Sequence, residues 1–273
     1  MVEKNNKTDV VANEQLLRQL LVEEKIESFR EYFLEIHPYD RAQFYERIGA
    51  EQRQILYRFL SPGEMADVFE AIDLEDDEYE EYLSEMDTSY VAAMLGFMYT
   101  DDAVDVLNEL DEDQRESYLE MMDTETVQEI NELLAYPEYT AGAIMTTEYV
   151  SITELSTVRS AMAVLRKKAP DAETIYYLFV VNEMHQLTGV LSLRDLIISD
   201  EDCLVRDIMS ERVVSVNVSE DQEAVAHIIK DYNFLAIPVI SDEKELLGII
   251  TVDDIIDVID EEAEDDYSKL AGI

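Results

Sequence analysis

The stretch Gly189-Val-Leu-Ser192-Leu-Arg-Asp195 returns later in the chain as Gly248-Ile-Ile-Thr251-Val-Asp-Asp254. In both copies a glycine and apolar residues typical of a strand lead into a hydroxyl, which a carboxylate follows three residues later. Ile144-Met-Thr146 similarly answers Ile208-Met-Ser210 at a shift of 64 residues, whereas the two glycines lie 59 apart. Two copies of one unit that differ by five residues in length predict a tandem repeat.

Each copy predicts the order strand, helix, strand, strand, helix. Alternating or continuous apolar runs indicate the strands, and apolar residues at helical spacing indicate the helices. In the first copy these elements are predicted over residues 149–152, 158–165, 175–181 and 189–191, with a helix from 192. In the second copy they are predicted over residues 213–216, 225–232, 237–240 and 248–250, with a helix from 253.

Residues 10–134 have a different character, helical throughout and almost free of glycine. Segments of about a dozen residues recur, and each begins with a residue that can cap a helix. The predicted caps are Ser61, Thr88, Thr100, Asp111 and Thr124. Short helical segments repeated in this way predict a stacked array or superhelix.

The segment Asp253–Asp266 holds nine carboxylates in fourteen residues and no basic residue. On a helix its acids form one stripe, and Ile255, Val258 and Ile259 lie on the other side. Like charges one turn apart repel each other. Either the acidic face is merely solvated, or a hard cation offsets the repulsion.

The net charge of the whole chain excludes or disfavours several classes of function. With 64 acidic against 20 basic residues, the net charge is −44 and the pI is near 4.1. Nucleic-acid binding is excluded because phosphate contacts need a positive surface, and basic docking on an anionic membrane is disfavoured. An acidic surface concentrates cations, although a halophilic or simply acidic protein has the same composition.

Other residue types exclude further classes. Cys203 is the single cysteine, so a disulfide framework is ruled out and a reducing compartment is expected. The three histidines are dispersed, without zinc-type spacing. No signal peptide, and no apolar run long enough to cross a bilayer, is present. Because no nucleophile–base pair or cofactor loop is found, we predict that the chain is not an enzyme.

The repeat resembles a pair of CBS modules. In that family the pattern Gly189-x-x-Ser192-x-x-Asp195 belongs to a nucleotide pocket, so the resemblance implies Ser192, Arg194 and Asp195 as candidate ATP contacts. The same pattern is also an ordinary helix start. Thr251 and Asp254 suit a nucleotide less well, because their acidic surroundings repel a triphosphate.

The junction Leu134-Ala-Tyr-Pro-Glu-Tyr-Thr-Ala-Gly-Ala-Ile-Met-Thr146 resembles the link between the helical N domain and the CBS pair of MgtE-type magnesium transporters and channels. Residues 172–177, 189–196 and 248–254 fit the same family. The implied fold is α + α/β, an all-helical superhelical N domain followed by a tandem CBS pair and a C-terminal acidic helix. The expected boundaries are a disordered N-terminus (1–12), N domain (13–136), first CBS domain (137–200), second CBS domain (201–256) and acidic plug helix (253–273).

The resemblance also implies Mg²⁺ bound by acids of the N domain, the CBS pair and the plug helix. The residues that match are Asp67, Asp101, Asp105, Asp254, Asp257, Glu262, Asp265 and Asp266. Small, hard Mg²⁺ prefers oxygen ligands and keeps several waters, although Ca²⁺ and Mn²⁺ also suit such ligands. Asn233 stands where relatives carry an aspartate, which predicts a weaker site there.

The leading hypothesis is therefore the cytosolic Mg²⁺-sensing region of a Mg²⁺ transporter or channel, which closes the pore when Mg²⁺ bridges these acids. Mg²⁺ would be both the regulatory and the transported ion. The family implies a homodimer attached to its own transmembrane domain, on the cytoplasmic side of the membrane in a multi-pass protein. The alternative is a soluble CBS adaptor that senses adenine nucleotides.

Overall fold

The computed structural model describes residues 14–72, 74 and 76–259. The predicted disordered N-terminus (1–12) and residues 260–273 of the acidic segment lie outside the described residues. The chain divides into two compact units. The first comprises Met1–Met98 and Asp102–Gln128, and the second comprises Tyr99–Asp101 and Glu129–Ile273.

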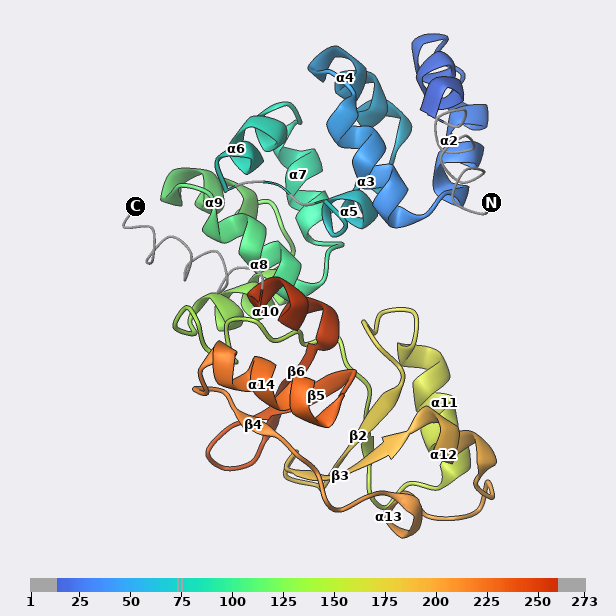
Figure 1. The fold of residues 1–273 in the computed structure, drawn as a ribbon, viewed down its shortest axis with the longest axis vertical. Helices are drawn as coiled ribbons and strands as arrows, with labels where there is room; N and C mark the ends of the chain where they lie inside the picture. The colour runs from blue at the N-terminus through green and yellow to red at the C-terminus, as the bar shows by residue number, and fades with distance from the viewer. Residues whose placement is uncertain (1–13, 73, 75, 260–273) are drawn as a thin grey trace. The chain divides into compact units, whose positions relative to one another are not determined.

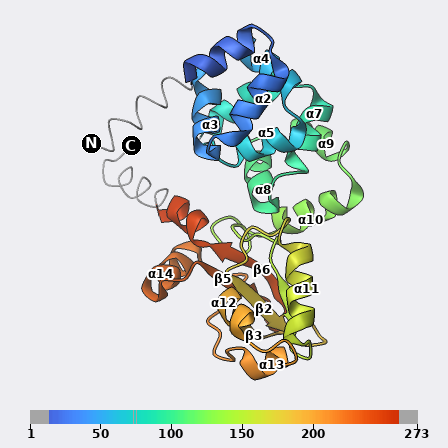
Figure 2. The ribbon, with the colours of Figure 1, turned by 90° about the vertical axis from the view of Figure 1, so that its right-hand side faces the viewer.

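Short helices succeed one another along the first half of the chain (Figures 1 and 2). After a helix over residues 14–22 come α2 (Ile26–Glu35), α3 (Pro38–Arg47), α4 (Ala50–Phe59), α5 (Pro62–Phe69), α6 (Asp76–Ser84), α7 (Thr88–Leu95), α8 (Thr100–Asn108), α9 (Glu112–Leu119) and α10 (Thr124–Leu134). From α2 on, each begins 12 residues after the one before it, except for one interval of 14 between α5 and α6. This regular spacing confirms the predicted array of dozen-residue segments.

The helical array is held by contacts between helices two and three places apart. The helix α3 packs on α5, α5 on α7, and α7 on α9. Arg30 of α2 binds Glu64 of α5, three helices on, through both carboxylate oxygens. Buried Arg53 of α4 likewise pairs with Glu85. A buried pair of this kind is costly to break, because the remaining charge is left without compensation.

Side-chain caps define where several helices begin. Ser61 accepts from the backbone N–H of Glu64, and the Glu64 carboxylate accepts from the N–H of Ser61, which forms a capping box. Asp111 caps α9 as predicted. The predicted caps Thr88, Thr100 and Thr124 were one residue late, since each is the first helical residue of α7, α8 or α10. Asp87 precedes α7, and Asp123 accepts the first N–H groups of α10.

The second unit contains two three-stranded sheets of the same design. The first has the order β1 (Ser151–Thr153), β2 (Tyr177–Val181) and β3 (Leu187–Ser192), with α11 (Val158–Lys168), α12 (Leu193–Ile198) and α13 (Val205–Ile208). The second has the order β4 (Val216–Asn217), β5 (Ala236–Ile240) and β6 (Leu246–Thr251), with α14 (Gln222–Tyr232). In each sheet the first two strands are parallel and the last two antiparallel.

The repeat predicted from the sequence is confirmed in the ladders. A register shift falls at Val180/Val181 in one sheet and at the matching Val239/Ile240 in the other. The prediction missed the short helix α13, and it made the strand before α14 longer than β4 is. Of the residues predicted as this strand (213–216), only Val216 pairs in the sheet, with Val239 of β5, so the apolar pattern overstated the strand.

Each module completes the sheet of the other. Thr146, which precedes β1 in the first module, exchanges backbone hydrogen bonds with Ile249 of β6. Ser210, which precedes β4 in the second module, does the same with Val190 of β3. The matching Ile-Met-Thr and Ile-Met-Ser triplets therefore end in the residues that join the two modules.

The described part of the acidic segment is a helix over residues 252–259. Ile255 and Val258 on its apolar face are buried within the chain, whereas Ile259 is 40% exposed. None of the helices in the described part of the chain combines the length and the apolar character that crossing a membrane requires.

Candidate cation and nucleotide sites

Asp254 lies at the junction between β6 and the helix over residues 252–259. The hydroxyl and the backbone N–H of buried Thr251 both donate to its Oδ2, at 2.6 and 3.1 Å. Burial raises the pKa of Asp254, and the neighbouring Asp253 acts in the same direction. One predicted ligand is thus a helix-capping carboxylate in a poorly solvated position.

Glu173 is a second carboxylate at this junction, and the sequence reasoning did not single it out. Burial raises its pKa to about 8, and the Asp254 carboxylate adds to the effect. Its Oε2 is buried and has no hydrogen-bond partner among the described residues. Nothing in the spacing of Glu173 marks it, because it lies in the loop between α11 and β2 of one module, whereas Asp254 lies on the helix after β6 of the other.

The surroundings of Glu173 and Asp254 suit a hard cation chemically. The neighbouring polar groups are oxygens, including the hydroxyls of Thr146 and Thr251. Either a proton or a cation relieves the repulsion between two poorly solvated carboxylates. Mg²⁺ commonly binds through one or two carboxylates and keeps waters on its other positions, so a two-carboxylate arrangement fits it.

The predicted ligands of α8 differ in their environment. Asp101 and Asp105 lie one turn apart on this helix, as expected, but Asp101 is buried and Asp105 is exposed. In the helix over residues 252–259, Asp257 is exposed. Within residues 14–72, 74 and 76–259, no three carboxylate, imidazole or thiol side chains converge closely enough to hold a metal ion. The described carboxylates could therefore supply only one or two ligands to any one ion.

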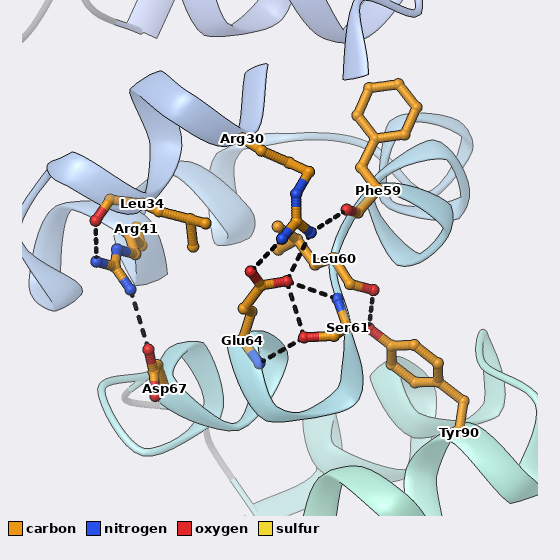
Figure 3. A network of polar contacts seen from close by, with 9 residues as sticks. All are labelled: Arg30, Leu34, Arg41, Phe59, Leu60, Ser61, Glu64, Asp67 and Tyr90. Carbon is orange, nitrogen blue, oxygen red and sulfur yellow. Dashed lines mark hydrogen bonds and ion pairs between the residues drawn. The ribbon is translucent and has the colours of Figure 1, made fainter. Parts of the chain in front are cut away.

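Asp67 already has a cationic partner. Its Oδ2 accepts from the Arg41 guanidinium at 3.1 Å, and Arg41 also donates to the carbonyl of Leu34 (Figure 3). Part of the Asp67 charge is therefore offset without a metal ion. The remaining predicted ligands, Glu262, Asp265 and Asp266, lie outside the described residues.

Asn233 forms the C-cap of α14 in the left-handed region, with φ of 53°. Asparagine tolerates this conformation better than most residues, because its short polar side chain can bond locally. An asparagine at this position thus has a local conformational use.

A separate cavity of about 500 Å³ lies beside β3 and α12. Its walls are mostly aromatic and aliphatic, and the polar side chains are two tyrosines, one serine and one arginine. The lining residues are Tyr176, Tyr177, Ser192, Leu193, Arg194, Ile197, Ile198 and Leu235.

Two of the three predicted nucleotide contacts, Ser192 and Arg194, line this cavity. Asp195 does not line the described cavity wall but contacts Ser192, which does. Its Oδ2 accepts from the Ser192 hydroxyl at 2.7 Å, and its N–H donates to the Ser192 hydroxyl oxygen. A mostly apolar cavity with a few polar groups is typical of a small-molecule site, and tyrosine rings can stack on a base.

Comparisons with known proteins account for both halves of this architecture. The model of the MgtE intracellular N domain matches residues 36–139, and the CBS domain model matches residues 141–201 and 205–261. A crystal structure of the soluble part of a magnesium transporter is 52% identical, with a TM-score of 0.91, and the match covers 93% of this chain and 99% of that one. The chain belongs to the MgtE family.

Its MgtE relatives include the magnesium transporter MgtE of Enterococcus faecalis, which is 54% identical over 94% of this chain. The match covers 57% of that relative, so this chain spans little more than half the length of a whole MgtE protein. The cytosolic domain of the Mg²⁺ channel MgtE, solved in complex with ATP, is 38% identical with a TM-score of 0.82. That match covers 89% of this chain and 98% of the other.

Proposed function

We propose that this chain is the Mg²⁺-sensing regulatory region of a Mg²⁺ transporter or channel, and that it closes the pore when Mg²⁺ neutralises its facing acids. The observation that carries the proposal is the pair of half-buried carboxylates formed by Glu173 and by Asp254 at the start of the acidic helix. Membership of the MgtE family supports the identity of the ion, which would also be the transported one.

The physical basis is repulsion between like charges in poorly solvated surroundings. Two unit charges about 6 Å apart repel by roughly 3 kcal/mol at an effective dielectric constant near 20. A few such pairs are enough to bias a two-state element whose states differ by a few kcal/mol. A divalent cation offsets this repulsion with its positive charge. It therefore favours the arrangement of the chain in which the acids lie closest together.

The candidate residues divide into a described and an undescribed group. Asp101, Asp105, Asp254 and Asp257 are proposed to hold Mg²⁺, and we add Glu173 as a neighbour that shares the charge at Asp254. Asp67 is the weakest candidate because it is paired with Arg41. Glu262, Asp265 and Asp266 of the acidic helix remain predictions from the family resemblance.

Thermal unfolding in MgCl₂ and in NaCl at matched ionic strength tests the proposal. One site filled to ten times its dissociation constant adds about 1.4 kcal/mol to the free energy of unfolding. We expect millimolar Mg²⁺ to raise the melting temperature well beyond the effect of NaCl. Equal stabilisation by both salts would reduce the effect to screening and would refute specific binding.

Nucleotide sensing is the second candidate function, favoured by the cavity that Ser192 and Arg194 line. We propose that ATP is its ligand, since a family member of known structure was solved with ATP. Calorimetric titration of one sample with Mg²⁺ and then with ATP separates the two functions. Heat from ATP alone would favour a nucleotide-sensing adaptor over a Mg²⁺ sensor.

We also propose that the chain is a homodimer through its CBS pair, attached to a transmembrane domain on the cytoplasmic side of the membrane. Ile255 and Val258 are buried within the chain, so the apolar face of the acidic helix does not need a second subunit to cover it. The better support is a patch around the cavity, where Ile197 is 62% and Ile198 is 72% exposed. Sedimentation of an Ile198→Asp variant should show a weaker dimer than wild type, and monomers in both would refute the proposal.

The fold and its ligand candidates suit a regulatory rather than a catalytic role. We propose that the chain is not an enzyme, because its MgtE relatives are named as transporters. Turnover of ATP by the purified chain, measured as phosphate release, would contradict this.

A further inference from the structure

Glu148 differs from the other acids around the candidate cation site because both of its carboxylate oxygens are already bonded to protein donors. Its Oε1 accepts from the Thr100 hydroxyl at 2.6 Å. Its Oε2 accepts from the Thr146 hydroxyl at 2.7 Å and from the backbone N–H of Thr147 at 3.1 Å. A carboxylate whose two oxygens already accept these hydrogen bonds is a poor metal ligand, but it can hold the segments that donate to it in a fixed position.

The donors come from two separate stretches of the second unit. Thr100 is the first residue of α8 and is 5% exposed, while Thr146 is fully buried in the segment before β1. Thr147 adds a longer contact to each side, to Glu148 and to the Thr100 hydroxyl, both at 3.3 Å. Glu148 therefore fixes the start of α8 to residues 146–147.

The same segment is bonded to the strand that ends at the acidic helix. Thr146 exchanges two backbone hydrogen bonds with Ile249, at 2.8 and 3.0 Å. Two residues further along β6, Thr251 holds the Asp254 carboxylate. The Glu148 carbonyl, in turn, accepts from the backbone N–H of Glu173. A continuous set of hydrogen bonds thus connects Thr100 with the junction that carries Asp254.

We propose that Glu148 is a positioning residue for cation sensing, which holds the first turn of α8, and with it Asp101, in register with Asp254 and Glu173. The inference rests on the proposed function, because it assigns Glu148 a role only if those acids bind Mg²⁺. Glu148 itself is not a ligand. Its contribution is to remove the freedom of Asp101 relative to the other carboxylates, which lowers the entropic cost of binding one ion.

The test measures the Mg²⁺ concentration at the midpoint of thermal stabilisation, at constant ionic strength, for the whole chain. Glu148→Gln loses the acceptor for the Thr147 N–H or must turn its amide, and Thr100→Val loses the hydroxyl with little change in shape. We expect each to raise the midpoint concentration roughly 3- to 10-fold, as for other residues that couple sites. Thr100→Ser keeps the hydroxyl and should retain the wild-type midpoint.

The double variant distinguishes a shared contact from two unrelated losses. If Thr100 and Glu148 act through their mutual hydrogen bond, Thr100→Val combined with Glu148→Ala, which removes the acceptor, should shift the midpoint no further than Glu148→Ala alone. Thr157→Val is the matched control, because it removes the hydroxyl that caps α11. It should lower the melting temperature without moving the Mg²⁺ midpoint.

Two results would overturn the inference in distinguishable ways. If Glu148→Gln and Thr100→Val lower the melting temperature in Mg²⁺-free buffer but leave the midpoint unchanged, Glu148 is structural only and the proposed function survives. If the wild-type chain shows no stabilisation by Mg²⁺ beyond that by Na⁺, the proposed function and the role of Glu148 fall together.

Discussion

The sulfur of Met209 lies against Gly189, so closely that a Cβ at position 189 would come within 2.5 Å of it. Met145 and Gly248 repeat the relationship in the other module, where the added carbon would also come within 2.6 Å of the Thr146 carbonyl oxygen. The residue before each joining bridge thus packs on a glycine of the opposite module. Side-chain volume at these two glycines controls whether the modules can pair.

Substitution of either glycine by alanine should destabilise the CBS pair. Because interiors are close-packed, an inserted methyl group typically costs about 1–3 kcal/mol. Gly248→Ala should be the more harmful, since it meets a backbone oxygen that cannot turn away, whereas Met209 can adopt another rotamer. Urea denaturation of both variants measures the effect.

Gly63→Ala is the control for these substitutions. It lies within α5, where an added Cβ makes an ordinary 3.4 Å contact with the exposed ring of Phe97 and where alanine is favoured over glycine by about 1 kcal/mol. It should be neutral or stabilising. A loss at Gly248 no larger than that at Gly63 would contradict the packing argument.

Protonation of Glu173 should make stability depend on pH. Its pKa is about 8 in the folded chain against an ordinary value of 4.5, so the folded state keeps a proton that the unfolded state releases between these values. The stabilisation is complete below pH 4.5 and is lost as the pH rises through 8. Glu173→Gln mimics the protonated form and does not titrate. Between pH 6 and pH 9 its free energy of unfolding should therefore rise relative to that of wild type by on the order of 2 kcal/mol.

The comparison is made by chemical denaturation at several pH values without Mg²⁺. The Glu183→Gln substitution in the exposed turn after β2 controls for the loss of one negative charge. If the free energies of unfolding of Glu173→Gln and wild type differ by the same amount at every pH from 6 to 9, the carboxyl is not protonated in the folded chain.

Arg194→Ala should weaken ATP binding about tenfold, the effect of losing one hydrogen bond to a charged group. Arg194 is the only cationic residue on the cavity wall as the structure describes it. Lys230→Ala, at an exposed lysine of α14, changes the net charge equally and should leave the affinity unchanged. Titration calorimetry with ATP measures both, and equal affinities for the two variants would remove the cavity as the nucleotide site.

In the full-length transporter, Asp101→Ala combined with Asp254→Ala should weaken inhibition by cytosolic Mg²⁺ while the pore still conducts. Removing both carboxylates leaves less charge to neutralise and fewer oxygen ligands. Patch recordings at increasing internal Mg²⁺ measure the inhibition curve. A curve that overlays the wild type would reduce both carboxylates to a solvated or structural role.

Two further variants separate charge from capping in that experiment. Asp254→Asn removes the charge but keeps an acceptor for Thr251, so it tests the ion without uncapping the helix. The exposed pair Asp113→Ala and Glu220→Ala removes two acids elsewhere and should not alter the inhibition.

The predictable part of this protein follows from local chemistry. Helix spacing near 12 residues, the capping Ser61 and Asp111, and the alternation around Ile152 are all properties of neighbouring residues, and each was confirmed. The tandem repeat was predictable because two copies of one fold must bury the same positions. Ser192 and Arg194 on one cavity wall likewise follow from a strand that runs directly into a helix.

The sequence by itself determined the helical array, the paired modules, the family and the excess of acid that points to a cation. Only the tertiary structure decided which acids are desolvated, which are paired with a cation and which have both oxygens hydrogen-bonded. Glu173 has no local signature, because burial and the approach of Asp254 from the other module raise its pKa. Arg41 offsets Asp67 from two helices away, and Glu148 is saturated by three threonines, two of them its neighbours and one 48 residues distant. The amino-acid composition fixes the net charge. The desolvation of each acid and its hydrogen-bond or ion-pair partners depend on which distant segments pack together.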